Sequence, residues 1–587
     1  MSAPSRAVGA QPTGSLAAGR LGVPAVLFFV MSAATPLTVV AGVVTTGFAT
    51  TGLIGIPIAF LVVGLLLAVF SVGYVAMARH MANSGAFYTF VSRGVGRPAG
   101  VGAAWVALVA YNALQVGLYG AIGSAAGPLL DEWFGINPDW WVVALVCWAV
   151  VAVLGVLRID VNGTVLAVLL CAEVLIILIY SFADLGNPAA GLSGATLDPG
   201  NLFGDGVGAI LVLALLGFVG FEASVVFSEE AKDPKRTVRT ATYIAVGATA
   251  ILYTFASWAM TVATGPDAIV ERSQNESVGL IFSLAGANLG DAWVTIGEVL
   301  FFTSITAAMI SFHNTIARYM FALGRERVLP VALGRTSAAT QAPRNASLVQ
   351  SVIGLAVIVI YAIGGWEPTV HLFFWGGTSG GLGVLFLITL TALAVLLFFR
   401  RSTHGESLWS RLVAPAVALI ALAVVVVLAV VNFDALLGVA PDSALAWAIP
   451  VAFVVIGLLG AAYGLWLRTN QPEVYAAIGS GGAAAKVSSA AEVSPAAEAE
   501  PAAEAEPAAE AEPAAEAEPA AEAEPAAEAE PAAKAEPAAE AEPAAKAEPE
   551  AEPEAEPEPT AEPEPAAKAE PAAKAEPAAG SEAADAK

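Results

Sequence analysis

Residues that bind metals or carry out redox chemistry are scarce in this 587-residue sequence. The two cysteines, Cys147 and Cys171, both lie inside apolar runs, which argues against a disulfide framework or a metal cluster. The four histidines are scattered along the chain, and neither an HExxH nor a CxxC motif is present. The sequence therefore predicts no metal, no cofactor and no enzymatic activity.

Charge is also scarce, since only 13% of the residues are charged whereas 57% are hydrophobic. Most of that charge lies at one end, because the residues from 481 onward include 28 acidic and 6 basic side chains. The formal net charge of −25 therefore says little about a ligand. Apolar runs of about 20 residues recur before this end, which excludes an ordinary soluble protein.

Three regions follow from this distribution. The sequence predicts a disordered cytoplasmic leader at residues 1–20, a transmembrane domain at residues 21–470 and a disordered acidic cytoplasmic tail at residues 471–587. In the tail, Ala/Glu/Pro repeats place a proline at about every sixth position, which stops a helix before it can propagate.

The predicted fold is an all-α membrane protein with twelve transmembrane helices. The apolar segments lie near residues 24–47, 53–79, 99–129, 141–157, 163–183, 206–228, 239–264, 292–322, 347–365, 369–399, 412–432 and 445–467. Nineteen of the twenty basic residues before the tail fall in the leader and in alternate loops, and the opposite loops hold only Arg272. This asymmetry predicts that both termini are cytoplasmic.

Two of the apolar segments contain residues that interrupt a helix. Gly217, Gly220 and Glu222 lie in the middle of the sixth segment, where a carboxylate costs about 2.5–3.5 kcal/mol on insertion scales and so marks function. Pro36 lies in the first segment, and it removes a helix hydrogen bond and disfavours helical geometry at Thr35. The breaks are five helices apart, which matches breaks in two repeats of five helices; the resemblance described below implies that these repeats are inverted and that two more helices are appended.

Two adjacent breaks would expose carbonyl groups and N–H groups that together fit a zwitterion, without any side-chain charge. On this basis the predicted substrate-binding residues are Ser32, Ala33, Ala34, Thr35, Thr38, Gly217, Phe218, Gly220, Phe221 and Glu222, with Tyr111 and Gln115 from the third helix. Tyr111 and Gln115 are equally consistent with polar contacts between helices, and Phe221 is equally consistent with ordinary packing.

Glu222 and Glu173 are the predicted proton-coupling residues, because burial favours the protonated form of a carboxylate. Each is also consistent with a structural role. Glu222 could be a hydrogen-bond acceptor that fixes the break, and Glu173 could be a packing residue with a hydrogen bond.

Several segments together resemble the amino acid–polyamine–organocation superfamily of permeases. They are Gly-Phe-Val-Gly-Phe-Glu-Ala at residues 217–223, the following loop at 228–236, Asn-Ser-Gly-Ala-Phe-Tyr at 83–88, and Arg-Tyr-Met-Phe-Ala-Leu-Gly-Arg at 318–325. The resemblance covers about residues 20–470. It implies a secondary active transporter of amino acids or related amines in the cytoplasmic membrane, working by alternating access and driven by protons or by exchange.

The sequence departs from this superfamily at two positions. Ala-Thr-Pro-Leu-Thr at residues 34–38 stands where the family commonly has a glycine-rich break, and Glu173 stands where several proton-coupled members carry a lysine. The substrate and the coupling ion, a proton or sodium, therefore stay open. The predicted partners are a small amine-bearing solute, that ion and the lipid bilayer, with no nucleic acid. The alternatives are a polyamine or organic cation carrier and an amino acid sensor that does not transport.

Overall fold

The computed structural model describes residues 15–81, 83–204 and 206–481, all within a compact unit that spans residues 1–498. The second unit, residues 499–587, lies outside the described residues. The helices are α1 (Val23–Ala33), α2 (Pro36–Thr38), α3 (Thr45–Thr51), α4 (Ile56–Ala78), α5 (Ala86–Gly94), α6 (Arg97–Phe134), α7 (Trp140–Val156), α8 (Ile159–Gly186), α9 (Val207–Leu216), α10 (Pro234–Thr264), α11 (Ile269–Glu276), α12 (Leu280–Leu289), α13 (Asp291–Arg325), α14 (Arg344–Gly364), α15 (Trp375–Arg401), α16 (Ala414–Val431), α17 (Phe433–Leu437), α18 (Ala444–Asn470) and α19 (Pro472–Ala477).

Shorter helical segments of other types lie between these helices. The π-helical segments are η1 (Val39–Val44), η8 (Thr369–Phe374) and η9 (Trp409–Val413), and the 3-10 segments are η2 (Ala195–Leu197), η3 (Pro199–Leu202), η4 (Phe221–Val225), η5 (Ser228–Glu230), η6 (Ser277–Gly279) and η7 (Val331–Gly334). Within the described residues the fold contains no β-strand, only an isolated bridge between Leu21 and Ala231. The all-α prediction is confirmed for this part of the chain.

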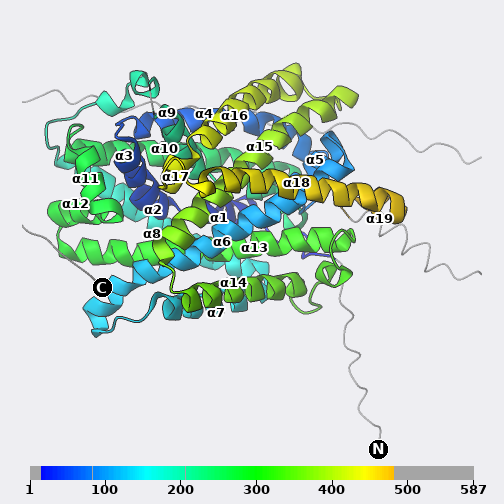
Figure 1. The fold of residues 1–587 in the computed structure, drawn as a ribbon, viewed down its shortest axis with the longest axis horizontal. Coiled ribbons are helices and arrows are strands. Elements are labelled where there is room, and N and C mark those ends of the chain that lie inside the picture. Colours follow the sequence, from blue (N-terminus) through cyan, green and yellow to red (C-terminus); the bar gives the residue numbers. More distant parts are fainter. Residues whose placement is uncertain (1–14, 82, 205, 482–587) are drawn as a thin grey trace, which may run out of the picture. The chain divides into compact units, whose positions relative to one another are not determined.

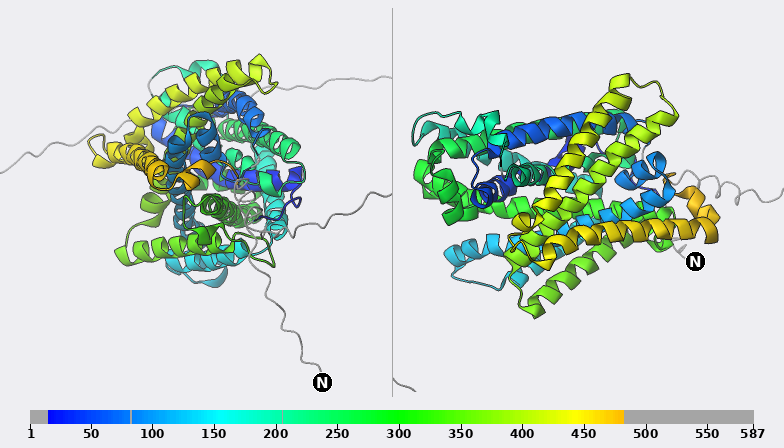
Figure 2. Two further views of the ribbon diagram at one scale, coloured as in Figure 1. Left: turned by 90° about the vertical axis from the view of Figure 1, so that its right-hand side faces the viewer. Right: turned by 45° about the horizontal axis from the view of Figure 1, so that its top comes forward.

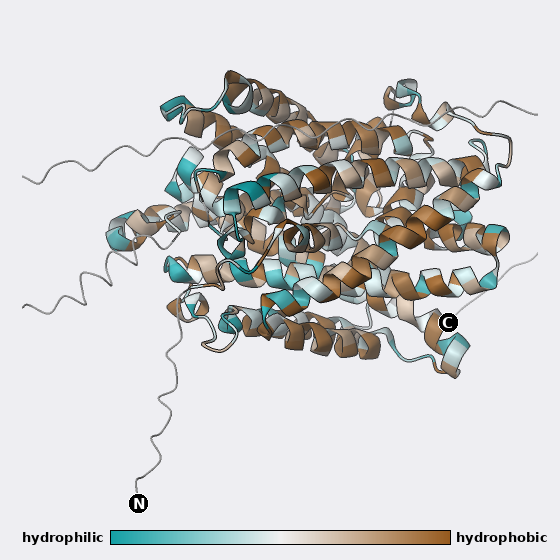
Figure 3. Cartoon of the chain, turned by 180° about the vertical axis from the view of Figure 1, so that it is seen from behind, coloured by the Kyte–Doolittle hydropathy of each residue, from teal (hydrophilic) through white to brown (hydrophobic). Residues whose placement is uncertain are grey.

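In the described part of the chain, eleven helical stretches are long and apolar enough to cross a membrane. The predicted fourth segment corresponds to α7, which has 17 residues and is shorter than the others. At 1.5 Å per residue such a helix is about 25 Å long, somewhat less than a hydrocarbon core of about 30 Å. In Figure 1 the long helices α6, α13 and α14 run side by side, and the left view of Figure 2 looks along many of the helices. Hydrophobic residues cover their middles and hydrophilic residues gather toward their ends (Figure 3).

Burial distinguishes the spans from one another. In the first span (Val23–Thr51) and the span Val207–Val225, 83% and 89% of the most apolar window is buried inside the protein, against 17% for Ala444–Asn470. An irregular backbone is tolerated at membrane depth only where protein or water meets its polar groups. The two interrupted spans therefore lie at the centre of the bundle.

Parts of the predicted leader and tail pack against the membrane domain. Before α1, the N–H groups of Arg20 and Leu21 both donate to the carbonyl of Glu230, at 2.9 Å. After α18, helix α19 leads to Gly479, whose carbonyl accepts from Arg93 Nε at 2.8 Å. These contacts lie in segments that the sequence assigned to the leader and the tail, and residues 1–14 and 482–587 lie outside the described residues.

Candidate functional site

The first span is interrupted at Pro36, where the sequence predicted a break. Helix α1 ends at Ala33 and α2 begins at Pro36, while Thr35 adopts left-handed backbone angles with φ 45° and ψ 65°. The proline explains this geometry because it disfavours right-handed helical angles in the residue before it. A threonine with positive φ is strained, and such strain concentrates at functional sites.

The second break is the longer one. Helix α9 ends at Leu216, Gly220 has φ 119°, and the chain continues as the 3-10 segments η4 and η5 until α10 begins at Pro234. Glycine tolerates this backbone conformation because it has no Cβ atom. The described structure thus places an irregular segment where the sequence has Gly217, Gly220 and Glu222.

The two breaks touch each other. A Cβ atom on Gly220 would lie 2.7 Å from the Cβ of Ala33 and 3.2 Å from the amide nitrogen of Ala34. On the other side of this contact, the hydroxyl of Tyr253 in α10 donates to the carbonyl of Ala34 at 2.9 Å. Glycine at position 220 is therefore required for the close approach of the two irregular segments.

Glu222 is directed at the backbone of its own break and at α6. Its Oε2 accepts from the Gly220 N–H at 2.9 Å and its Oε1 accepts from the Tyr111 hydroxyl at 2.8 Å, while its carbonyl accepts from the Tyr74 hydroxyl at 2.7 Å. The side chain is fully buried. These contacts favour a structural role for Glu222, in which the carboxylate fixes the conformation of the break.

Glu173 in α8 makes the corresponding contact at the first break. Its Oε1 accepts from the Leu37 N–H, at the start of α2, and from the Ser304 hydroxyl, each at 2.6 Å. Ser304 also lies 3.1 Å from Thr38 Oγ1. The second oxygen, Oε2, is buried and has no hydrogen-bond partner among the described residues. A buried carboxylate oxygen without a partner is costly, and a bound proton would remove part of that cost.

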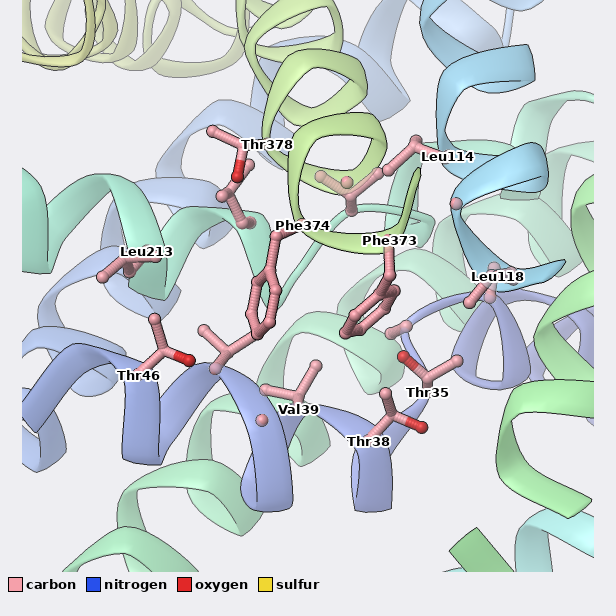
Figure 4. A pocket seen from close by; sticks show the side chains of 18 of the residues that line it. Thr35, Thr38, Val39, Thr46, Leu114, Leu118, Leu213, Phe373, Phe374 and Thr378 are labelled. Atoms are coloured by element: carbon pink, nitrogen blue, oxygen red, sulfur yellow. The ribbon is translucent and has the colours of Figure 1, made fainter. Parts of the chain in front are cut away.

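A cavity of about 130 Å³ opens beside the first break (Figure 4). Its lining residues are Ala33, Ala34, Thr35, Thr38, Val39, Gly42, Val43, Thr46, Leu114, Gly117, Leu118, Leu213, Leu216, Val219, Phe312, Phe373, Phe374, Gly377, Thr378 and Leu436. Of these described residues none carries a charge, and the polar side chains are four threonines. Backbone groups of the breaks and threonine hydroxyls are thus the polar groups available to a ligand.

Four of the predicted binding residues line this cavity, namely Ala33, Ala34, Thr35 and Thr38. The other eight are not among its lining residues, and they are Ser32, Gly217, Phe218, Gly220, Phe221, Glu222, Tyr111 and Gln115. Among these, the Phe221 ring packs edge-on against Phe70 with centroids 6.0 Å apart, and Gln115 Nε2 donates to the Tyr119 hydroxyl at 3.1 Å. The first break therefore supplies four of the predicted residues to the cavity, whereas the second break supplies Val219, which the sequence did not single out.

Several lining residues did not follow from the sequence. Phe373 and Phe374 come from the π-helical segment η8, and Figure 4 shows their rings extending toward Thr35 and Val39 of the first span. Phe312 comes from α13, and Thr46 from α3. The available signal was the aromatic pair at 373–374 followed by a glycine-rich stretch at 376–383, which allows close helix approach.

Two ion pairs join the 3-10 segment η5 to the end of α13. There Arg318 forms an ion pair with Glu230 through contacts of 2.6 and 3.0 Å, and both side chains are 1% exposed. Arg325 pairs with Glu229 through two contacts of 2.7 Å. The Arg325 partner and the Ser84 N–H and hydroxyl hold the pKa of Glu229 below its usual value despite burial. Both carboxylates follow the second break, so these pairs tie it to α13.

Comparison with known proteins gives a consistent result. The family described as "Amino acid permease" matches residues 21–459. The "Uncharacterized amino acid permease YecA" of Bacillus subtilis is 30% identical over 154 residues, which cover 26% of this chain and 34% of that protein. The "Probable GABA permease" of Pseudomonas aeruginosa is 22% identical over 371 residues, which cover 60% of this chain and 74% of that protein.

A third relative, "Cationic amino acid transporter 7, chloroplastic" of Arabidopsis thaliana, is 25% identical over 209 residues, which cover 35% of this chain and 32% of that protein. The chain thus spans about a third of the length of the Bacillus and Arabidopsis relatives and about three quarters of the Pseudomonas one.

Proposed function

The chain belongs to the amino acid permease family and is an integral membrane protein, and from this premise we propose that it moves amino acids across the cytoplasmic membrane as a secondary active transporter. The observation that carries the proposal is the cavity beside two touching helix breaks, whose described lining residues carry no charge. A solute with both an ammonium and a carboxylate group matches such a site, because helix ends offer partial charges of both signs.

The wall of the cavity favours substrates with an apolar side chain. Phe312, Phe373 and Phe374, together with Leu114 and Leu118, face a solute bound at the first break. A charged substrate side chain would lose its hydration there without gaining a partner, which costs free energy. We therefore expect neutral amino acids to bind more tightly than cationic ones.

The membrane topology follows from the same proposal. The twelve helices, counting α7, would form two inverted repeats of five, with α16 and α18 appended and both termini in the cytoplasm. The distribution of basic residues supports this orientation. The cavity then lies on the outer side of the breaks, and the buried pair Arg318–Glu230 and the partly buried pair Arg325–Glu229 would close the cytoplasmic side.

Transport would proceed by alternating access. The first, second, sixth and seventh spans would rock against the remaining helices, so contacts between the two groups must break and reform. Glu173 makes such a contact, because it joins α8 to the Leu37 N–H of the first span. An ionised carboxylate accepts a hydrogen bond more strongly than a protonated one. Proton binding at the unpartnered Oε2 would therefore loosen this tie and couple transport to a proton.

Uptake into proteoliposomes tests the proposal. A panel of radiolabelled amino acids is offered with and without an inward proton gradient, and with sodium replaced by choline. We expect uptake of neutral amino acids that the proton gradient drives and that choline replacement leaves unchanged. In Glu173→Gln we expect the gradient to lose its effect while exchange of internal for external substrate continues. Sodium-dependent uptake by the parent protein would contradict proton coupling.

A polyamine or organic cation carrier is the alternative within the same family. Such a solute has no carboxylate and would depend on Glu222 and Glu173, yet neither residue lines the cavity. Competition separates the two functions. We expect alanine to inhibit uptake and putrescine to leave it unchanged, whereas the reverse pattern would favour the cation carrier. Ligand binding without uptake by the full-length protein would favour a sensor.

A further inference from the structure

A second hollow lies on the surface, at the end of α4 and the start of α10. It is an open cup of about 660 Å³, lined by Arg79, Asp233, Lys235, Arg236, Arg239, Thr240, Tyr243 and Ile244. Helices α4 and α10 pack against each other along their length, so the cup lies at the end of a seam between two spans.

The cup carries an excess of positive charge, since its lining has four cationic side chains and one carboxylate. The carboxylate of Asp233 is engaged as the cap of α10, where its Oδ1 accepts from the Arg236 N–H at 3.1 Å. Arg79 is partly neutralised by Glu406 at 3.5 Å. In the described part of the chain, no ion pair involves Lys235, Arg236 or Arg239.

An exposed apolar strip continues from the cup along α10. Tyr243, Ile244 and Ile251 are 36%, 43% and 69% exposed. Gly247 lies four residues after Tyr243, three after Ile244 and four before Ile251, and these spacings place it on the same side of the helix as all three. A Cβ atom on Gly247 would meet nothing within 4 Å, so the strip has a shallow gap at this residue. In a membrane protein such a strip faces lipid chains.

From this juxtaposition we propose that the cup binds the phosphate headgroup of an anionic phospholipid whose acyl chain lies along Tyr243, Ile244, Gly247 and Ile251. Arginine matches a phosphate group in charge and geometry, lysine matches it in charge, and basic residues next to a transmembrane helix attract anionic lipids. In the proposed orientation the cup lies in the cytoplasmic leaflet. The ligand is a lipid rather than a free phosphate, because the cationic cup and the apolar strip are continuous.

Lipid titration of the purified full-length protein tests the proposal. The protein is stripped of lipid in a neutral detergent, and its thermal unfolding midpoint is measured against the concentration of dioleoylphosphatidylglycerol. The zwitterionic lipid dioleoylphosphatidylcholine and the soluble compound glycerol 3-phosphate serve as comparison ligands. We expect phosphatidylglycerol to raise the midpoint with saturation, at concentrations where the other two have no effect.

Variants then locate the site. In Arg236→Gln/Arg239→Gln we expect the apparent affinity for phosphatidylglycerol to fall about thirtyfold, which is about fivefold for each cation removed. The matched control, Arg335→Gln/Arg344→Gln, removes two exposed cations outside the cup, one just after η7 and one at the first residue of α14, and should retain the parent affinity. An equal loss of phosphatidylglycerol affinity in the two double variants would show that the lipid is attracted nonspecifically by charge, which would overturn the proposal.

A third variant separates a lipid from a free phosphate. Gly247→Phe places a bulky ring at the gap in the apolar strip, where an added Cβ atom meets nothing within 4 Å, and it leaves the residues that line the cup unchanged. We expect it to weaken phosphatidylglycerol binding while any millimolar response to glycerol 3-phosphate stays unchanged. Unchanged lipid affinity in Gly247→Phe, or parent affinity in the Arg236/Arg239 double variant, would overturn the proposal.

Discussion

Glu222 and Glu173 each accept a hydrogen bond from a backbone N–H beside a helix break. A helix that starts inside a membrane leaves N–H groups without partners, and in an apolar environment each costs several kcal/mol. A carboxylate meets this need better than a neutral acceptor. The two residues differ in their second carboxylate oxygen. In Glu222 this oxygen accepts a hydrogen bond from the Tyr111 hydroxyl, whereas in Glu173 it has no hydrogen-bond partner among the described residues.

Replacing Glu222 by glutamine tests the first of these roles. The amide has one acceptor oxygen where the carboxylate has two, so either the Gly220 N–H or the Tyr111 hydroxyl loses its acceptor. An unsatisfied buried donor costs about 1–3 kcal/mol. We expect Glu222→Gln to reduce the initial rate of amino acid uptake about tenfold or more, while the amount of protein at the cell surface changes much less. Normal uptake of every tested substrate by this variant would remove Glu222 from the mechanism.

At the scale of secondary-structure elements, the two interrupted spans decide the architecture of the site. The first span breaks over two residues around Thr35, whereas the segment after α9 does not return to an α-helix before α10. Their contact depends on Gly220, which has a left-handed conformation and no room for a side chain. The strain at Thr35 and the close approach at Gly220 support one another.

Substitution of Gly220 by alanine should destabilise this contact. Both the positive φ and the 2.7 Å approach to Ala33 oppose a Cβ atom, and a strained residue of this kind costs about 1–3 kcal/mol. We expect a lower thermal unfolding midpoint in detergent and a loss of uptake.

Gly247→Ala is the control for the Gly220 substitution, because it places the same methyl group in a regular helix with open space around it. It should be neutral or stabilising by about 0.5–1 kcal/mol. Equal unfolding midpoints for the two alanine variants would show that the breaks do not depend on this contact.

At the scale of the whole molecule, the described C-terminal segment closes back onto the membrane domain. Glu326, at the end of α13, is buried and accepts from the N–H groups of Gly479 at 2.7 Å and Gly481 at 2.8 Å, and from the Tyr88 hydroxyl. Tyr88 lies in α5, and its N–H also donates to the hydroxyl of Tyr319 in α13 at 3.2 Å. The segment thus fastens α5 to α13.

This contact should depend on pH. Burial raises the pKa of Glu326, although the hydrogen bonds from Tyr88, Gly479 and Gly481 oppose the change. A raised pKa in the docked state means that docking is favoured at low pH and weakens as the pH rises through that value. Beyond the intrinsic pH dependence of amide hydrogen exchange, we expect the Gly479 and Gly481 amides to exchange faster at higher pH. The additional acceleration should be about tenfold for each unit by which the pKa of Glu326 is raised.

Glu326→Gln is the control for the pH prediction, because its side chain does not titrate. Amide exchange measured by mass spectrometry should lose the additional pH dependence in this variant. The same pH dependence in the parent and in Glu326→Gln would assign it to another group.

The sequence by itself determined the helices and the positions of their breaks. Apolar runs set the spans because an apolar α-helix satisfies its own backbone hydrogen bonds and buries no charge in lipid. Pro36 and Gly220 mark the interruptions because their effect on the backbone is local. Only the tertiary structure decided which residues line the cavity. Phe373 and Phe374 reach it from a distant π-helical segment, while Glu222 turns away from it toward Tyr111. Side-chain direction depends on neighbours from other helices, and the order of residues along one helix does not contain that information.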